Sequence, residues 1–309
     1  MKCRKIVLIA VDLLLLLVFI VQCSASKKDS AKVFTFSDEV TEITIKSSNE
    51  IISVIKEGEN WFVGDKKYPA NHSSVESLVT ALKEIRALDN VGKITKSGLS
   101  DRYELIDSKA ILVEAKSGDK VVRKIKLGKN SETGVQGYAV LDDKNDIYLI
   151  SGNLRNTFTK SVEDLRSKIV IGLEKSSIKS AHIENLDGVD WSLSRVASNG
   201  ETAWTISGLD ITVDSQKATS WLESLASLTT PKWYSEEDAK SLNGKKELSV
   251  KLESDNSVIS LEIFKIPGNE DDPNSTDKYY GKATSTPYIF EIAGYSVQKY
   301  LKNPEELAE

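Results

Sequence analysis

The chain has 309 residues, of which 40% are hydrophobic and 28% charged, and its formal net charge is -5 at pH 7. This composition is typical of a globular protein and excludes a fibrous or largely disordered one. The negative charge and the lack of a clustered lysine and arginine stripe argue against nucleic acid as a partner, because phosphate binding needs a basic face.

The first 26 residues are predicted to be a signal anchor or signal peptide. Basic residues near the N-terminus precede an apolar run from Ile6 to Val21, and polar residues follow it. This layout is typical of an exported chain whose N-terminus stays in the cytoplasm. We favour an uncleaved anchor in the cytoplasmic membrane, because the run with its flanks is marginally long enough to span a bilayer. Residues after about 26 are then extracytoplasmic, in the cell envelope.

Two other interpretations of the leader stay open. Cys23 directly follows the apolar run and could be lipidated, although Gln22 stands where lipoproteins normally have a small residue. Ordinary cleavage near Ala25 is the second alternative. Asp12, the one charge inside the run, either reaches interfacial water or contacts another membrane helix. All three interpretations of the leader export the rest of the chain.

An internal repeat is the strongest pattern in the exported part. The segment around Trp61 aligns without gaps to the segment around Trp204 at a constant offset of 143, which also pairs Asn71 with Asp214. The match resumes at later hairpin, strand and short-helix segments, with offsets that differ by loop-sized gaps. We therefore predict a linker over 27–39, repeat unit 1 over 40–171 and repeat unit 2 over 174–309.

Each copy predicts the same order of elements. A strand hairpin carrying the tryptophan leads to a helix, which Asn71 or Asp214 is placed to cap. Apolar residues recur at spacings of three and four along this helix, and a second hairpin, a strand and a short helix follow. The fold class is therefore α+β, a tandem duplication of a mainly antiparallel sheet unit with one principal helix per copy, behind an N-terminal membrane or signal helix.

At these residues the chain resembles the bacterial family called domain of unknown function 4340. The resemblance is carried by WFV with the following YPAN and helix, by the strands GYAV and IYLIS, and by the segment SVEDLRSKIVI. Members of this family are often associated with ABC-type export systems, including ones linked to gliding motility. The resemblance implies an accessory role beside such a permease, and it supplies no catalytic residues.

Aromatic residues are the main candidates for surface contacts. Trp61, Trp204 and Trp221 fall at predicted core positions of the repeat. Trp191 and Trp233, the latter followed by Tyr234, have no aromatic counterpart in the first copy. These three residues are the candidate surface aromatics, with core or edge packing of the two tryptophans as the favoured alternative.

Reactive and metal-binding patterns are missing from the sequence. Cys3 and Cys23 both belong to the leader, and His72 and His182, the only histidines, lack a metal-binding spacing. The acidic segment around Asp271 lacks the spacing of a calcium loop and is predicted to be a solvated loop. We predict no catalytic, cofactor-binding or metal-binding residues.

The expected function is therefore a non-catalytic envelope protein that interacts with a membrane complex, such as an ABC permease. A glycan- or lipid-binding module with a groove between the two copies is the alternative. An envelope hydrolase would require a cluster of acidic residues or histidines around a shared pocket.

Overall fold

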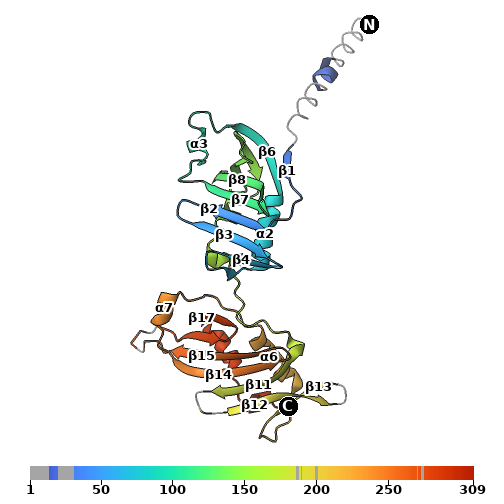
Figure 1. Cartoon of the computed structure of the whole chain (residues 1–309), viewed down its shortest axis with the longest axis vertical. Helices are drawn as coiled ribbons and strands as arrows, with labels where there is room; N and C mark the ends of the chain where they lie inside the picture. Colours follow the sequence, from blue (N-terminus) through green and yellow to red (C-terminus); the bar gives the residue numbers. More distant parts are fainter. Residues whose placement is uncertain are drawn as a thin grey trace, which may run out of the picture. The chain divides into compact units, whose positions relative to one another are not determined.

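The computed structural model describes residues 14–19, 31–185, 188, 190–198, 201–269, 271–272 and 275–309. It divides into two compact units, unit 1 from Met1 to Ser167 and unit 2 from Lys168 to Glu309 (Figure 1). Each unit has a mixed α+β fold built on an antiparallel sheet with few helices, as the sequence predicts.

The predicted leader lies mostly outside the described residues, and so do Asp12 and Cys23. Residues 14–19 are helical and have exposed side chains. Within the described part of the chain, no helix has the length and apolar character needed to cross a membrane.

Unit 1 is built on a ten-stranded sheet in the order β1-β6-β10-β9-β8-β7-β2-β3-β4-β5. Its strands are β1 (Lys32–Thr35), β2 (Glu42–Lys46), β3 (Ile51–Glu57), β4 (Asn60–Val63), β5 (Tyr68–Pro69), β6 (Glu84–Lys93), β7 (Ile111–Ser117), β8 (Lys120–Asn130), β9 (Gln136–Leu141) and β10 (Asp146–Ser151). Its helices are α2 (His72–Lys83), α3 (Leu99–Arg102), α4 (Leu154–Phe158) and α5 (Val162–Leu165).

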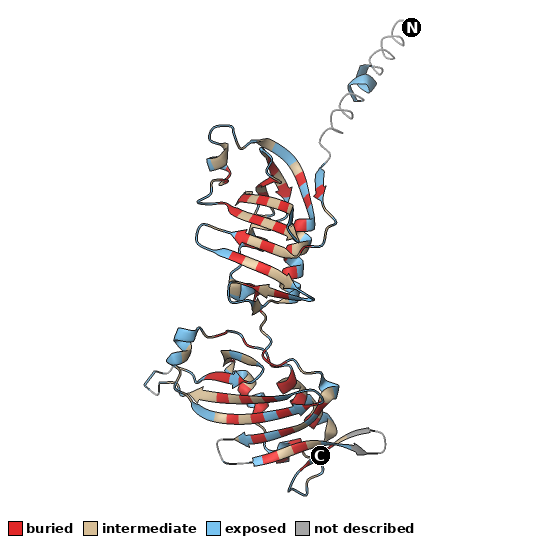
Figure 2. Ribbon diagram, viewed as in Figure 1, coloured by how far each residue is buried: buried red, intermediate tan, exposed pale blue. Residues whose placement is uncertain are grey.

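Alternation along the strands gives the sheet of unit 1 two different faces. In β7, Ile111, Val113 and Ala115 are buried on the face that α2 and α4 cover, which we call the inner face (Figure 2). The residues between them lie on the opposite, outer face and are only partly buried. The core of unit 1 therefore sits between the inner face and the helices.

Helix α2 begins where the sequence predicts. The side chain of Asn71 accepts a hydrogen bond from the Ser74 backbone N–H over 2.9 Å, which satisfies a donor of the first helical turn. Val75, Leu78 and Leu82 are buried at spacings of three and four residues, so one stripe of the helix packs on the inner face.

Unit 2 is built on a seven-stranded sheet in the order β13-β12-β11-β14-β15-β16-β17. Its strands are β11 (Ile178–Asn185), β12 (Asp190–Ser198), β13 (Glu201–Ile206), β14 (Lys245–Ser254), β15 (Val258–Ile266), β16 (Lys278–Ala283) and β17 (Thr286–Ile292). Its helices are η2 (Lys175–Ser177), α6 (Ser215–Ala226), α7 (Glu236–Lys240), α8 (Gly294–Tyr300) and η3 (Pro304–Leu307).

The two units share one strand order. Read from β17 to β13, the sheet of unit 2 repeats the order from β10 to β4 in unit 1, with β11 in the place of β2 and β14 in the place of β7. Trp61 lies in β4 and Trp204 in β13, so both tryptophans occupy the same strand of their units, as the repeat predicts. Asp214 caps α6 as Asn71 caps α2.

A backbone contact also closes each unit in the same way. The Asn71 N–H donates to the Leu165 carbonyl over 2.7 Å, and the Asp214 N–H donates to the Leu307 carbonyl over 2.8 Å. Both leucines are buried, and each ends a short helix that starts with a capping box. The last helix of each unit is thereby fastened to the residue before its principal helix.

The observed units begin earlier than the predicted ones. The predicted linker 27–39 contains strand β1, which belongs to the sheet of unit 1. In this strand Val33 pairs with Arg86 of β6. In unit 2, residues 168–173 take the same role: Ile169 forms a bridge with Thr229, 143 residues after Arg86. Strand β6, which follows α2 directly, was also not predicted, because its second half is polar and exposed.

The junction between the units is short. The Ser167 N–H donates to the Pro69 carbonyl in unit 1 over 2.7 Å, and the next residue, Lys168, accepts from the Thr230 N–H in unit 2 over 2.8 Å. Because Ser167 and Lys168 are adjacent in sequence, no linker residue lies between these two hydrogen bonds.

Candidate functional site

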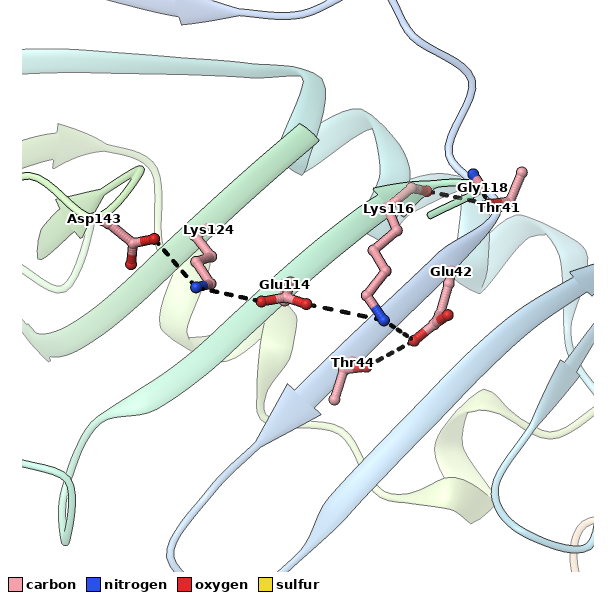
Figure 3. Close-up of polar contacts among 8 residues, drawn as sticks. All are labelled: Thr41, Glu42, Thr44, Glu114, Lys116, Gly118, Lys124 and Asp143. Carbon is pink, nitrogen blue, oxygen red and sulfur yellow. Dashed lines mark hydrogen bonds and ion pairs between the residues drawn. The ribbon is translucent and has the colours of Figure 1, made fainter. Parts of the chain in front are cut away.

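The outer face of unit 1 carries a row of paired charges that crosses three strands and ends at the turn after β9. Lys116 and Glu114 on β7 lie beside Glu42 on β2, Lys124 on β8 and Asp143 after β9 (Figure 3). Positive and negative side chains alternate along this row, which we call the charge ladder. Opposite charges on neighbouring strands stabilise the register of a sheet.

The distances show a continuous set of contacts. Lys116 Nζ donates to Glu42 Oε1 over 2.9 Å and lies 4.0 Å from Glu114 Oε1. Lys124 Nζ lies 3.6 Å from the other oxygen of Glu114 and donates to Asp143 Oδ2 over 3.1 Å. The Thr44 hydroxyl donates to Glu42 over 3.4 Å and ends the ladder.

These pairings move the pKa of the lysines. A hydrogen bond to Glu42 raises the pKa of Lys116, and a hydrogen bond to Asp143 raises the pKa of Lys124. Beside the ladder, the hydrogen bond from Lys126 lowers the pKa of Asp107. Lys116, Lys124 and Asp107 therefore keep their charges at neutral pH, so none of these three is poised to exchange protons.

A shallow hollow of about 550 Å³ adjoins the ladder. Leu112 and Val140 form apolar parts of its lining, whereas Lys46, Lys126 and Asp107 lie around it. Lys126 Nζ lies 2.6 Å from Asp107 Oδ1, while Lys46 makes no ion pair with any described residue. The volume falls within the range of small-molecule sites.

The segment 94–110 contributes Asp107 to the lining of the hollow and covers the outer face over β9 and β10. Tyr103 and Leu105 from this segment pack with Val140 and Ile147 in a small separate cluster. Gly128 permits this close approach, because a Cβ there would lie 2.1 Å from the Tyr103 carbonyl oxygen. The hollow is therefore fixed in place by packing and does not depend on a free loop.

The chemistry available at this site is recognition by charge and apolar contact. Its ionisable groups are lysines and carboxylates, and those of the charge ladder are paired with one another. Across the described residues, no group of three or more His, Cys, Asp or Glu side chains is placed to hold a metal ion. The site thus offers a shaped, charged surface, with no activated nucleophile among the ladder residues.

The two histidines belong to different units. His72 is exposed at the start of α2, where its Nε2 lies 3.2 Å from Glu76. His182 lies on the outer face of unit 2, with Nδ1 2.9 Å from Ser192 Oγ and Nε2 3.3 Å from Asp190 Oδ1. Ser192 could not be assigned to His182 from the sequence, because it lies on the neighbouring strand β12 and meets His182 only through strand pairing. His182 and Asp190 are exposed, and Ser192 is partly buried.

The candidate surface aromatics require a correction. Trp191 and Trp233 are only 3% and 6% exposed, so neither offers a surface contact. Trp191 is an inward residue of β12 and stacks on Trp221 at 5.5 Å, while Trp233 packs edge-to-face on Phe290. Tyr234 alone is partly exposed. Trp61, Trp204 and Trp221 are buried, as predicted.

Part of the acidic segment of unit 2 is described. Asp277 Oδ2 lies 2.8 Å from Lys265 Nζ, and Asp277 Oδ1 accepts the Gly268 N–H over 3.1 Å. Asp271 and Asp272 are exposed, in agreement with a solvated loop. Asp142 and Asp143 form the turn after β9, both with positive φ angles.

These features define a two-unit α+β protein with antiparallel sheets and an open, charged outer face. The family model described as Domain of unknown function (DUF4340) matches residues 61–247, which is more than half of the chain. The chain belongs to this family. No curated protein and no solved structure matches it.

Proposed function

We propose that this chain is a non-catalytic protein of the cell envelope, held in the cytoplasmic membrane by its leader, with residues after about 26 outside the cytoplasm. We also propose that it serves as an accessory subunit of an ABC-type export complex and contacts a multi-span permease. The family's association with such systems motivates the choice of partner.

The observation that carries the proposal is the outer face of unit 1. Its side chains are held in fixed positions by the charge ladder, yet they remain partly accessible to solvent. Ordered charges of both signs around an apolar hollow suit recognition of another protein, since electrostatic complementarity selects partners and orients them. A set of mutually neutralised lysines and carboxylates offers little to an enzyme reaction.

We further propose that the two units arose by tandem duplication. The shared strand order, the equivalent caps Asn71 and Asp214 and the equivalent closing contacts of Leu165 and Leu307 support this origin. A duplicated unit doubles the available surface, so one unit can change its surface while the other keeps an earlier contact.

Binding of a lipid or glycan is the second candidate function. The apolar lining at Leu112 and Val140, together with Lys46, favours an amphipathic ligand with an anionic group. A protein anchored in a membrane would also be close to lipids that could serve as ligands.

A pull-down from mild detergent tests the first candidate. We expect the wild-type chain to co-purify with a permease, an Asp12→Leu variant to retain less of it, and a chain lacking Met1 to Ser26 to retain least, because tethering raises the effective concentration of the second contact. A Leu112→Arg variant, whose longer side chain fills the hollow, should also retain less of the permease. If none of these chains retains a membrane protein above background, the accessory role is wrong and the lipid or glycan candidate takes its place.

A further inference from the structure

The outer faces of the two units can be compared position by position, because their strands pair in the same order. In unit 1, a cross-strand row runs from Lys46 through Leu112 and Lys126 to Val140. In unit 2, the equivalent row runs from Glu184 through Ser249 and Glu262 to Lys282. The inward residues between these positions, such as Val113 and Val250, are buried in both units.

Charges at equivalent positions are inverted. Where the row of unit 1 has Lys46 and Lys126, the row of unit 2 has Glu184 and Glu262. The inversion continues on the next rows: Glu114 corresponds to Lys251, and Lys116 corresponds to Glu253, as their strand pairings show. Charged residues are therefore kept at these four positions while their signs are exchanged.

Part of this charge is not neutralised within its own unit. Lys46 and Glu262 make no ion pair with any described residue, and Glu184 has only Lys246 at 3.8 Å. Lys46, Glu184 and Lys251 are exposed. These groups remain available to a charged partner.

We infer that the outer face of unit 1 binds the outer face of unit 2 in a second copy of this chain. The inference rests on the proposed function in taking the outer faces as binding surfaces. Two sheets that pack face to face lie about 10 Å apart, a gap that long lysine and glutamate side chains can span. If the two faces are related by a local two-fold axis along the row, Lys46 faces Glu184 and Lys126 faces Glu262.

The same charges disfavour the competing arrangements. About the same axis, two copies joined through unit 1 alone would place Lys46 and Lys126 opposite identical lysines. Two copies joined through unit 2 alone would do the same with Glu184 and Glu262. Because opposed like charges are repulsive, the mixed contact is the favoured one about this axis. A mixed contact can close into a dimer or continue from copy to copy.

A charge-swap experiment tests this inference. The full chain is kept in mild detergent, and its mass is measured by sedimentation at low and high salt. We expect association at low ionic strength that is lost near 1 M salt, where the Debye length falls to about 3 Å. Lys46→Glu with Lys126→Glu, or Glu184→Lys with Glu262→Lys, should each weaken association at least tenfold. Combining all four substitutions should restore it.

Lys83→Glu with Lys160→Glu is the matched control, since it changes the net charge equally at exposed sites on α2 and after α4, away from the rows. Association of the control should equal that of the wild type, and circular dichroism should show that every variant is folded. A wild-type chain that stays monomeric at low salt, or a fourfold variant that is not restored, overturns the inference. If the chain is monomeric but still co-purifies with a permease, the inference is wrong and the proposed function is supported. If the chain self-associates but captures no membrane protein, the inference is supported and the proposed function is wrong.

Discussion

Arg123 is buried to 3% exposure and donates through Nη1 to Asp142 Oδ2 over 2.6 Å. The same guanidinium donates through Nε to the Leu82 carbonyl near the end of α2 over 3.1 Å. Arg123 therefore joins the principal helix of unit 1 to the turn after β9. Its counterpart in unit 2 is Ile259, so this connection is specific to unit 1.

The first prediction concerns this buried charge. Asp142→Asn keeps a residue that tolerates the positive φ angle of 51° but removes the charge opposite Arg123. Because a buried charge that loses its partner is strongly unfavourable, we expect unit 1 to lose about 2–3 kcal/mol, reduced from the fully buried case by the partial exposure of Asp142. Urea unfolding measures the loss. Asp143→Asn, at the exposed neighbour, should change stability by less than about 0.5 kcal/mol.

The helix caps provide a second prediction. Asn71→Ala and Asp214→Ala should each destabilise their own unit by about 1 kcal/mol, because each removes the acceptor for N–H groups of the first turn. The two effects should add in the double variant, since the caps belong to separate units. Thermal unfolding followed by circular dichroism provides the measurement. A His72→Ala control at the exposed start of α2 should have little effect.

The third prediction ranks three tryptophans of unit 2. Trp204 Nε1 donates to Thr219 Oγ1 over 3.1 Å and Trp221 Nε1 to the Tyr300 carbonyl over 3.2 Å, whereas Trp191 Nε1 is buried without a hydrogen-bond partner among the described atoms. Substitution by phenylalanine should therefore be about 1 kcal/mol less destabilising at Trp191 than at the other two. Equal losses at all three positions in urea unfolding would contradict this ranking.

Gly128 carries the fourth prediction. Gly128→Ala should displace segment 94–110 from the outer face, because the new Cβ would collide with the Tyr103 backbone. We expect a loss of about 1–3 kcal/mol and faster hydrogen exchange at Lys129, whose N–H donates to the Tyr103 carbonyl. Gly137→Ala in β9 is the matched control, since its Cβ would meet no atom closer than 3.6 Å. If hydrogen exchange at Lys129 is unchanged in the Gly128→Ala variant, the close approach at Gly128 does not hold segment 94–110 in place.

A pH dependence is expected at the end of unit 2. Hydrogen bonds from Lys302 and from the Asn303 N–H lower the pKa of Glu306 below its ordinary value of 4.5. A lowered pKa means that this carboxylate stabilises the fold above about pH 4.5 and that the contribution is lost as the pH falls through the lowered value. The effect should be a few tenths of a kcal/mol because the side chain is half exposed. Glu306→Gln should reduce the pH dependence of the melting temperature of unit 2 over this range, while Glu305→Gln should leave it unchanged.

Local signals along the chain explain what the sequence could predict. Asn71 and Asp214 stand directly before helical apolar spacing, so both caps were recognisable, and the tryptophans Trp61 and Trp204 set the register of the repeat. The charge ladder could not be found in this way, because Glu42 and Lys116 are 74 residues apart in sequence and meet only through strand pairing. Strands β1 and β6 were not predicted for a related reason. Each is positioned by its partner strand and lacks a clear alternation of apolar and polar residues along its whole length.

The direct junction at Ser167 and Lys168 has a consequence for proteolysis. A protease needs a stretch of several residues in extended, unpaired form to fit its active site. On either side of this junction, the backbone is already bonded to Pro69 or to Thr230. Cleavage there would first require the end of one sheet or the start of the other to open, so the two units of the intact protein are protected against being cut apart.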